Sequence, residues 1–202
     1  SINDLDITST DIDNYCNVYG DHIANIKGKA ERGKPTGIRE LRIERPTKES
    51  QVLHIDVFFV LDNIFLLGVA KPLSLILTKH ITNQTAEQLS DAVNGMVTFI
   101  RDHDLTVDKI ISDPAAYFTS PIFINNVNVK VEICPAGDHA YVAEIWVKLV
   151  KRAVRCTINS CIFKISSFFA ESIVSFCTMN LNSMPSGDYN TTSPYSMLTA
   201  KA

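Results

Sequence analysis

The chain has 202 residues, of which 46% are hydrophobic and 20% are charged, and its formal net charge at neutral pH is −3. This composition excludes an intrinsically disordered or low-complexity chain and fits one globular domain with short terminal extensions. The slightly acidic balance also excludes a uniformly basic nucleic-acid-binding protein, although it is compatible with a local stripe of cations.

The cysteines and the longest apolar stretch indicate where the chain is found. Five cysteines are scattered along it without a C-x-x-C pair, which does not suit a disulfide framework. We therefore expect reduced thiols and an intracellular protein. The most apolar stretch, residues 57–77, is interrupted by Asp62, Asn63, Lys71 and Pro72, so it cannot cross a bilayer as one helix. We expect no membrane partner.

The first fifty residues are predicted to lie outside the compact part of the chain. Residues 1–26 carry aspartates but no lysine or arginine, whereas residues 27–49 are rich in both cations and are punctuated by glycine and proline. This pattern predicts an acidic segment followed by a basic, largely extended arm, with a plain solvated linker as the alternative. We accordingly divide the chain into an arm (1–50), a core (51–182) and a C-terminal extension (183–202).

The core is predicted to open with three strands joined by hairpins. A β-branched and aromatic run at 52–60 is followed by an Asp62-Asn63 turn and further strands at 64–70 and 73–80. The hydrophobic period then changes to steps of three and four residues, which predicts a helix from Ala86 to Ile100, capped by Thr82 or Asn83.

Strands and helices alternate in the rest of the core. The pattern predicts strands at 107–112 and 128–134, a brief helix within 115–125, and two longer helices at 138–156 and 164–182. Three hairpin-linked strands that lead into such an alternation indicate a mixed sheet covered by helices.

Three carboxylates occupy unusual places in this layout. Asp56 lies inside the most apolar strand, Asp113 directly follows the fourth strand, and Glu144 opens the first turns of a helix. An acidic side chain in an apolar strand costs free energy, and ligands tend to bind at the carboxyl ends of strands in open sheets. Because no nearby residue in the sequence neutralises Asp56, a metal ion is its natural partner.

The helix that contains Glu144 carries a charged stripe. At about 100° per residue, the stripe is about 60° wide and consists of Glu144, Lys148, Lys151 and Arg155. A core-facing stripe on the opposite side is predicted at Val142, Ile145, Leu149, Ala153 and Cys156. A carboxylate followed by cations suits a metal ligand followed by phosphate contacts. A solvated helix face with an ordinary Glu144–Lys148 ion pair is the alternative, and the helix alone leaves both open.

Several short segments carry a family pattern. They are His-Ile-Asp-Val-Phe-Phe-Val at 54–60, Ile-Ser-Asp-Pro at 111–114, and His-Ala-Tyr-Val-Ala-Glu at 139–144, with Lys151 beyond. Together they resemble the catalytic core of retroelement integrases, most closely the copia-type retrotransposon branch. Residues 15–34 also resemble the link that precedes such cores, and residues 193–199 resemble the segment that closes them.

The resemblance implies an α/β fold of the ribonuclease H-like kind, with a five-stranded mixed sheet flanked by helices. It implies a DDE-superfamily polynucleotidyl transferase that integrates DNA, by processing 3′ ends and transferring strands between element ends and target DNA. Asp56, Asp113 and Glu144 would then be the catalytic triad and the ligands of two Mg²⁺ ions, for which Mn²⁺ can substitute. Lys148, Lys151 and Arg155 would bind DNA. A homo-oligomer in the nucleus, in a cytoplasmic particle, or in both is also implied.

Some positions depart from the family pattern. Pro114 stands where the retroviral branch commonly has Asn-Gly, and Tyr141 replaces a residue that is often small. These departures leave open a catalytically inactive or domesticated relative that binds DNA or supports assembly. A transposase or an RNA-strand nuclease on the same fold is a further alternative. A small-molecule α/β enzyme would need a glycine-rich phosphate loop, and the sequence has none.

Overall fold

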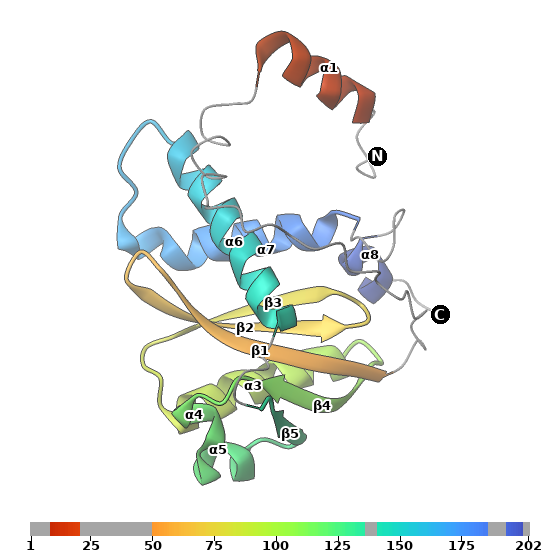
Figure 1. Cartoon of the computed structure of the whole chain (residues 1–202), viewed down its shortest axis with the longest axis vertical. Helices are drawn as coiled ribbons and strands as arrows, with labels where there is room; N and C mark the ends of the chain where they lie inside the picture. The colour runs from red at the N-terminus through yellow and green to blue at the C-terminus, as the bar shows by residue number, and fades with distance from the viewer. Residues whose placement is uncertain (1–8, 21–49, 136–140, 186–192, 200–202) are drawn as a thin grey trace.

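A five-stranded sheet with the strand order β3-β2-β1-β4-β5 forms the centre of the molecule (Figure 1). The computed structural model describes residues 9–20, 50–135, 141–185 and 193–199; the predicted basic arm at 27–49 lies outside them, as does His139 of the family pattern. The antiparallel strands are β1 (Ser50–Val60), β2 (Asn63–Lys71) and β3 (Leu75–Ile81). Next to β1, β4 (Thr106–Ser112) and β5 (Lys130–Ile133) run parallel to it.

Helices cover both faces of the sheet (Figure 1). One face carries α3 (Ala86–Arg101), α4 (Ala116–Thr119) and α5 (Pro121–Asn126). The other carries α6 (Tyr141–Ser160), a 3-10 turn (Ser167–Phe169) and α7 (Ala170–Ser183), and α8 (Pro194–Thr199) packs against α7. A further helix, α1 (Ser9–Tyr19), precedes the sheet in sequence. The predicted mixed sheet flanked by helices is thus confirmed. No helix among the described residues is both long and apolar enough to cross a membrane.

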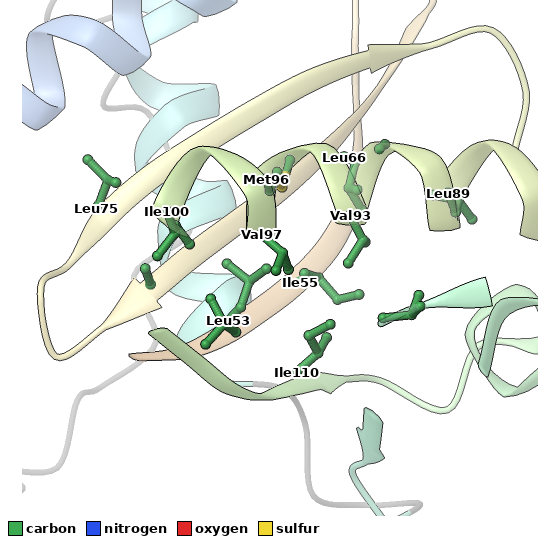
Figure 2. Close-up of a cluster of buried hydrophobic side chains, with 14 of the residues drawn as sticks. Leu53, Ile55, Leu66, Leu75, Leu89, Val93, Met96, Val97, Ile100 and Ile110 are labelled. Atoms are coloured by element: carbon green, nitrogen blue, oxygen red, sulfur yellow. The ribbon is translucent and has the colours of Figure 1, made fainter. Parts of the chain in front are cut away.

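The alternation of side chains along β1 divides the core into two clusters. Leu53 and Ile55 face α3 and pack among residues that the helix buries, which include Leu89, Val93, Met96, Val97 and Ile100 (Figure 2). Phe58 and Val60 belong to the second cluster, between the sheet and the helices α6 and α7. His54 and Asp56 lie in phase with Phe58 along the strand, so they share the face that α6 covers.

The start of α3 differs from the prediction. Its N-cap is Thr85, whose hydroxyl accepts a hydrogen bond from the backbone N–H of Gln88 at 3.4 Å. The Gln88 side chain in turn accepts from the backbone N–H groups of Thr82 and Asn83, at 3.1 and 2.8 Å. The predicted caps, Thr82 and Asn83, are therefore wrong. Thr85 thus satisfies one free donor of the first turn, while the Gln88 side chain holds the segment before the helix, and the Thr85 N–H donates to Asn83 Oδ1 at 3.3 Å.

The connection after β4 also differs from the prediction, because the brief helix expected within 115–125 is two helices. Ser120 has an extended backbone (ψ 134°) and separates α4 from α5, which begins with Pro121. The residue before a proline disfavours the helical region, and a proline suits the first position of a new helix. The Ser120 hydroxyl caps α5 by accepting from the N–H of Ile122.

The edge strand β3 is hydrogen-bonded to side chains of α7. The Asn182 amide accepts a hydrogen bond from the backbone N–H of Ile76 at 2.8 Å and donates one to its carbonyl at 2.7 Å. Asn182 is buried, and the hydroxyls of Thr78 and Thr178 make a further contact at 3.3 Å. Edge strands present main-chain groups without a partner strand, and here a helix side chain satisfies them.

Candidate functional site

Asp56 lies in the second half of the central strand β1, opposite Leu67 of β2. It is partly buried, and its Oδ1 accepts a hydrogen bond from the backbone N–H of Val57 at 2.7 Å. Burial raises the pKa of Asp56 to about 6, and the hydrogen bond from Val57 opposes this rise. A carboxyl group with such a pKa changes its charge near neutral pH, as groups at functional sites often do.

Asp113 comes directly after β4, the parallel neighbour of β1. Because Ile111 lies opposite His54 in the register, the chain leaves β4 beside the part of β1 that contains Asp56. Asp113 accepts a hydrogen bond of 3.4 Å from the backbone N–H of Ala115, which begins the turn into α4. After burial, the negative charge of Asp113 is the largest influence that raises the pKa of Asp56. The two carboxylates therefore share one electrostatic environment.

Glu144 lies in the first turn of α6 and reaches the same environment. Its charge also raises the pKa of Asp56, after burial and the charge of Asp113. Its Oε1 accepts a hydrogen bond from Lys148 Nζ at 2.9 Å, which is the i,i+4 ion pair expected of a helix surface. As the side chains are placed, no group of three or more His, Cys, Asp and Glu residues in the described ranges is arranged to hold a metal ion.

The face of α6 that meets the sheet differs from the prediction. The buried residues of α6 are Ala143, Val147, Val150 and Val154. The predicted core stripe is wrong in three of its five members: Val142 and Ala153 are partly buried and pack against this core, whereas Ile145, Leu149 and Cys156 are partly buried outside it. Small and β-branched side chains let the helix approach the sheet closely. Each of these buried residues is followed directly in the sequence by a residue of the charged stripe. Because successive residues of a helix are about 100° apart, the charged stripe lies about 100° from the buried face rather than opposite it.

This rotation places Lys151 and Arg155 of α6 beside the end of the central strand β1. Lys151 is partly buried, and its charge opposes the rise in the pKa of Asp56 that burial causes. Lys151 and Arg155 line a hollow of about 270 Å³ between α6 and the end of β1. Lys148, which is more exposed, pairs with Glu144. The three predicted DNA-binding residues thus lie along one side of α6, from Glu144 to the hollow.

The comparison with solved structures agrees with this arrangement of strands and helices. No protein-family model matches the chain, and no curated protein sequence matches it. The crystal structure of the catalytic core domain of BIV integrase aligns with 73% of this chain and 92% of its own chain, with a TM-score of 0.56 and 17% sequence identity. The chain has the fold of an integrase catalytic core. The ribonuclease H-like fold expected from the sequence is confirmed, and the copia-type assignment stays a prediction.

Two residues of the integrase-like core lie near the carboxylates although the sequence analysis did not single them out. Burial, followed by the charges of Asp113 and Asp56, raises the pKa of Tyr117 to about 12. Burial, followed by the charges of Lys71 and Lys109, lowers the pKa of His54 to about 4. At neutral pH the site therefore contains a protonated phenol and a neutral imidazole.

Strand periodicity could have identified His54, but no simple period identifies Tyr117. Asp113 precedes α4, so helical spacing does not relate it to Tyr117, whose ring packs edge-on against the buried Phe118, with centroids 4.6 Å apart. His54 precedes Asp56 by two residues in a strand, which places both side chains on the same face. His54 opens the segment 54–60 that carries the family pattern, whereas Tyr117 belongs to no motif in the sequence.

Proposed function

We propose that the protein is a DNA integrase core, a polynucleotidyl transferase that joins a DNA 3′ end to a target strand in a Mg²⁺-dependent reaction. Asp56, Asp113 and Glu144 are its catalytic carboxylates. One observation supports the proposal: carboxylates far apart in sequence, from β1, the end of β4 and the start of α6, lie close enough for the charges of two of them to act on Asp56. There, burial and the charges of Asp113 and Glu144 together raise the pKa of Asp56 to about 6.

The carboxylate oxygens of the proposed site are ligands of the kind that Mg²⁺ prefers. Mg²⁺ prefers hard oxygen ligands, and it usually binds through one or two carboxylates together with water and substrate phosphates rather than in an all-protein cage. Asp56 and Asp113 supply such oxygens from adjacent strands. Mutual repulsion among the carboxylates favours a bound cation. Glu144 is the third ligand in this proposal, and its ion pair with Lys148 competes with that role.

The chemistry is an exchange of phosphodiester bonds. A 3′-hydroxyl oxygen forms a new bond to phosphorus, and the bond to the target strand's own 3′ oxygen breaks. When bound, the metal ions activate the attacking oxygen and stabilise the leaving one. Lys151 and Arg155 neutralise phosphates on the strand beside Asp56, and Lys148 holds Glu144 at the end of this cationic track.

Strand transfer on a labelled DNA duplex tests the proposal. We expect joined products in Mg²⁺ or Mn²⁺ and none in EDTA, with activity restored when Mg²⁺ is added back. Joining that is equally efficient in EDTA would contradict a metal-dependent reaction.

A second candidate is a DNA-binding or assembly module that has lost the chemistry. The Glu144–Lys148 ion pair and the exposed Tyr141, which begins α6, favour this candidate. The two functions differ in metal binding. Calorimetric titration with Mg²⁺ should give a signal that Asp56→Asn removes if the protein is an enzyme, and no signal if it is a binding module only.

The proposal predicts a specific effect for Lys151→Ala. If Lys151 contacts a phosphate, its loss should weaken DNA binding and lower the slope of log affinity against log salt by about one. Fluorescence anisotropy with a labelled duplex at several salt concentrations measures this slope. Lys79→Ala is the matched control, because Lys79 is exposed on β3 and should leave the slope unchanged. An unchanged slope in Lys151→Ala would assign Lys151 to an ordinary solvated helix face.

A further inference from the structure

Three lysines lie in one row across the sheet, on the face that carries Asp56. In the register, Lys71 of β2 and Lys109 of β4 both lie opposite Val52 of β1. Lys130 of β5 in turn lies opposite Lys109. Residues directly opposite one another in a sheet project from the same face, and so do residues separated by an even number of positions along a strand. Because Val52 precedes Asp56 by four residues, the row of lysines shares the face of Asp56.

Two of these lysines are open to solvent. The sheet residues buried beneath α6 and α7 come from β1, β2 and β3, so β4 and β5 lie beside that covered area. The side chains of Lys109 and Lys130 are 37% and 72% exposed. Lys71 already has partners, because its Nζ donates to Ser74 Oγ at 2.7 Å and lies 5.8 Å from the centroid of the Trp146 ring. Lys109 and Lys130 are therefore the two lysines that a partner can reach.

These two lysines share a single carboxylate. Glu132 accepts a hydrogen bond from Lys109 Nζ at 2.7 Å on one oxygen and from Lys130 Nζ at 2.8 Å on the other. Two ammonium groups thus face one carboxylate, which leaves a surplus of positive charge. Like charges directly opposite each other in a sheet cost stability. A surplus of this kind on an open face is complementary to an anionic partner.

Cations lie on both sides of Asp56 along the central strand. Val52, which marks the row of lysines, precedes Asp56 by four residues, and Val60 follows it by four. Val60 lines the hollow that also contains Lys151 and Arg155. At about 3.3 Å per residue, each of these levels lies about 13 Å from Asp56. Phosphates of one DNA strand advance by about 3.4 Å along the helix axis, so this distance corresponds to about four nucleotides.

We infer that Lys109 and Lys130 form a second phosphate-binding surface for the DNA duplex whose reacting phosphate lies at Asp56. They contact the duplex about four nucleotides from that phosphate, on the side away from Lys151 and Arg155. In the free protein, Glu132 holds the two ammonium groups side by side. Phosphate contacts on both sides fix the position of a duplex without reading its sequence. The inference rests on the proposed function, because the duplex is its substrate.

Lys109→Gln and Lys130→Gln test this inference through binding of a labelled duplex in EDTA, where no chemistry intervenes. Each variant removes one charge and keeps most of the side-chain stem for packing. We expect each to lower the slope of log affinity against log salt by about one, and the double variant to lower it by about two. Lys109→Arg and Lys130→Arg should keep the wild-type slope, because they retain the charge. Glu132→Gln should bind the duplex more tightly than wild type, because it loses a negative charge beside the phosphates.

Lys79→Gln is the matched control. Lys79 is exposed on β3 and lies opposite Leu66, which belongs to the core cluster on the α3 face, so this variant removes the same charge from the opposite face. It should leave the slope unchanged. Wild-type slopes in both Lys109→Gln and Lys130→Gln would overturn the surface, as would an equal loss of slope in Lys79→Gln.

The result is separable from the test of function. A protein that joins DNA but keeps its salt slope in the double variant retains the proposed reaction and loses the surface. A protein without strand-transfer activity whose slope falls in the double variant, but not in Lys79→Gln, keeps the surface and loses the proposed reaction.

Discussion

Asp56→Asn and Asp113→Asn should each lower Mg²⁺-dependent strand transfer by about a thousandfold or more. Each replaces a carboxylate by a neutral amide at the position where β1 and β4 bring the two charges together. Metal ions at such a site supply several kcal/mol of stabilisation to the transition state, and each 1.36 kcal/mol corresponds to a factor of about ten in rate. Glu144→Gln should have a similar effect, because Glu144 is the third carboxylate of the group.

The controls for these variants distinguish lost chemistry from lost folding or lost binding. Asp91→Asn removes an exposed carboxylate from α3, on the opposite face of the sheet, and should retain wild-type activity. In EDTA, Asp56→Asn should bind DNA at least as tightly as wild type, because it has lost a negative charge near the phosphates. Wild-type rates in Asp56→Asn would exclude this carboxylate from the reaction.

Asp56→Asn should also make the protein more stable than wild type at pH 8 in the absence of metal. The pKa of Asp56 is about 6 in the folded protein, mainly because of burial, against an ordinary value of 3.8. The folded state therefore binds the proton more tightly than the unfolded state. The favourable contribution of protonated Asp56 is complete below about pH 4 and is lost as the pH rises through 6.

The expected gain for Asp56→Asn at pH 8 is about 1–2 kcal/mol, less than the roughly 3 kcal/mol that the full shift would give, because solvent reaches part of the side chain. Urea denaturation at pH 4 and pH 8 in EDTA measures it. The advantage of the variant should be absent at pH 4 and present at pH 8. A difference from wild type that is the same at both pH values would contradict this assignment. A variant that gains stability as it loses activity would mark a site arranged for function.

Local patterns explain why the sequence predicts most of the sheet and the helix α3. The strands β1, β2 and β3 are consecutive and separated by short turns, and α3 repeats apolar residues over several turns. The charged stripe of α6 is equally visible. The buried face of α6 is not, because apolar residues occupy two neighbouring stripes of this helix. Only packing decides between them, and the sheet selects the smaller side chains, from Ala143 to Val154.

The three carboxylates could be predicted from the sequence, whereas Tyr117 could not. Asp56 interrupts an apolar strand, Asp113 directly follows a strand, and Glu144 lies at the start of a helix. Each can therefore be recognised in the sequence without knowledge of the others. Tyr117 carries no such signal, since an aromatic residue in a short helix is unremarkable. Its position near Asp113 and Asp56 depends on how the chain turns from β4 into α4, which no local pattern describes.

The contact between α7 and the edge strand constrains how copies of this chain can associate. Asn182 occupies both the N–H and the carbonyl of Ile76, with bonds of 2.8 and 2.7 Å. A strand from a second copy would have to break both bonds, and displace a buried side chain, before it could pair with β3 at that position. Extension of the sheet across this edge is therefore blocked at Ile76, and a homo-oligomer would have to form through other surfaces.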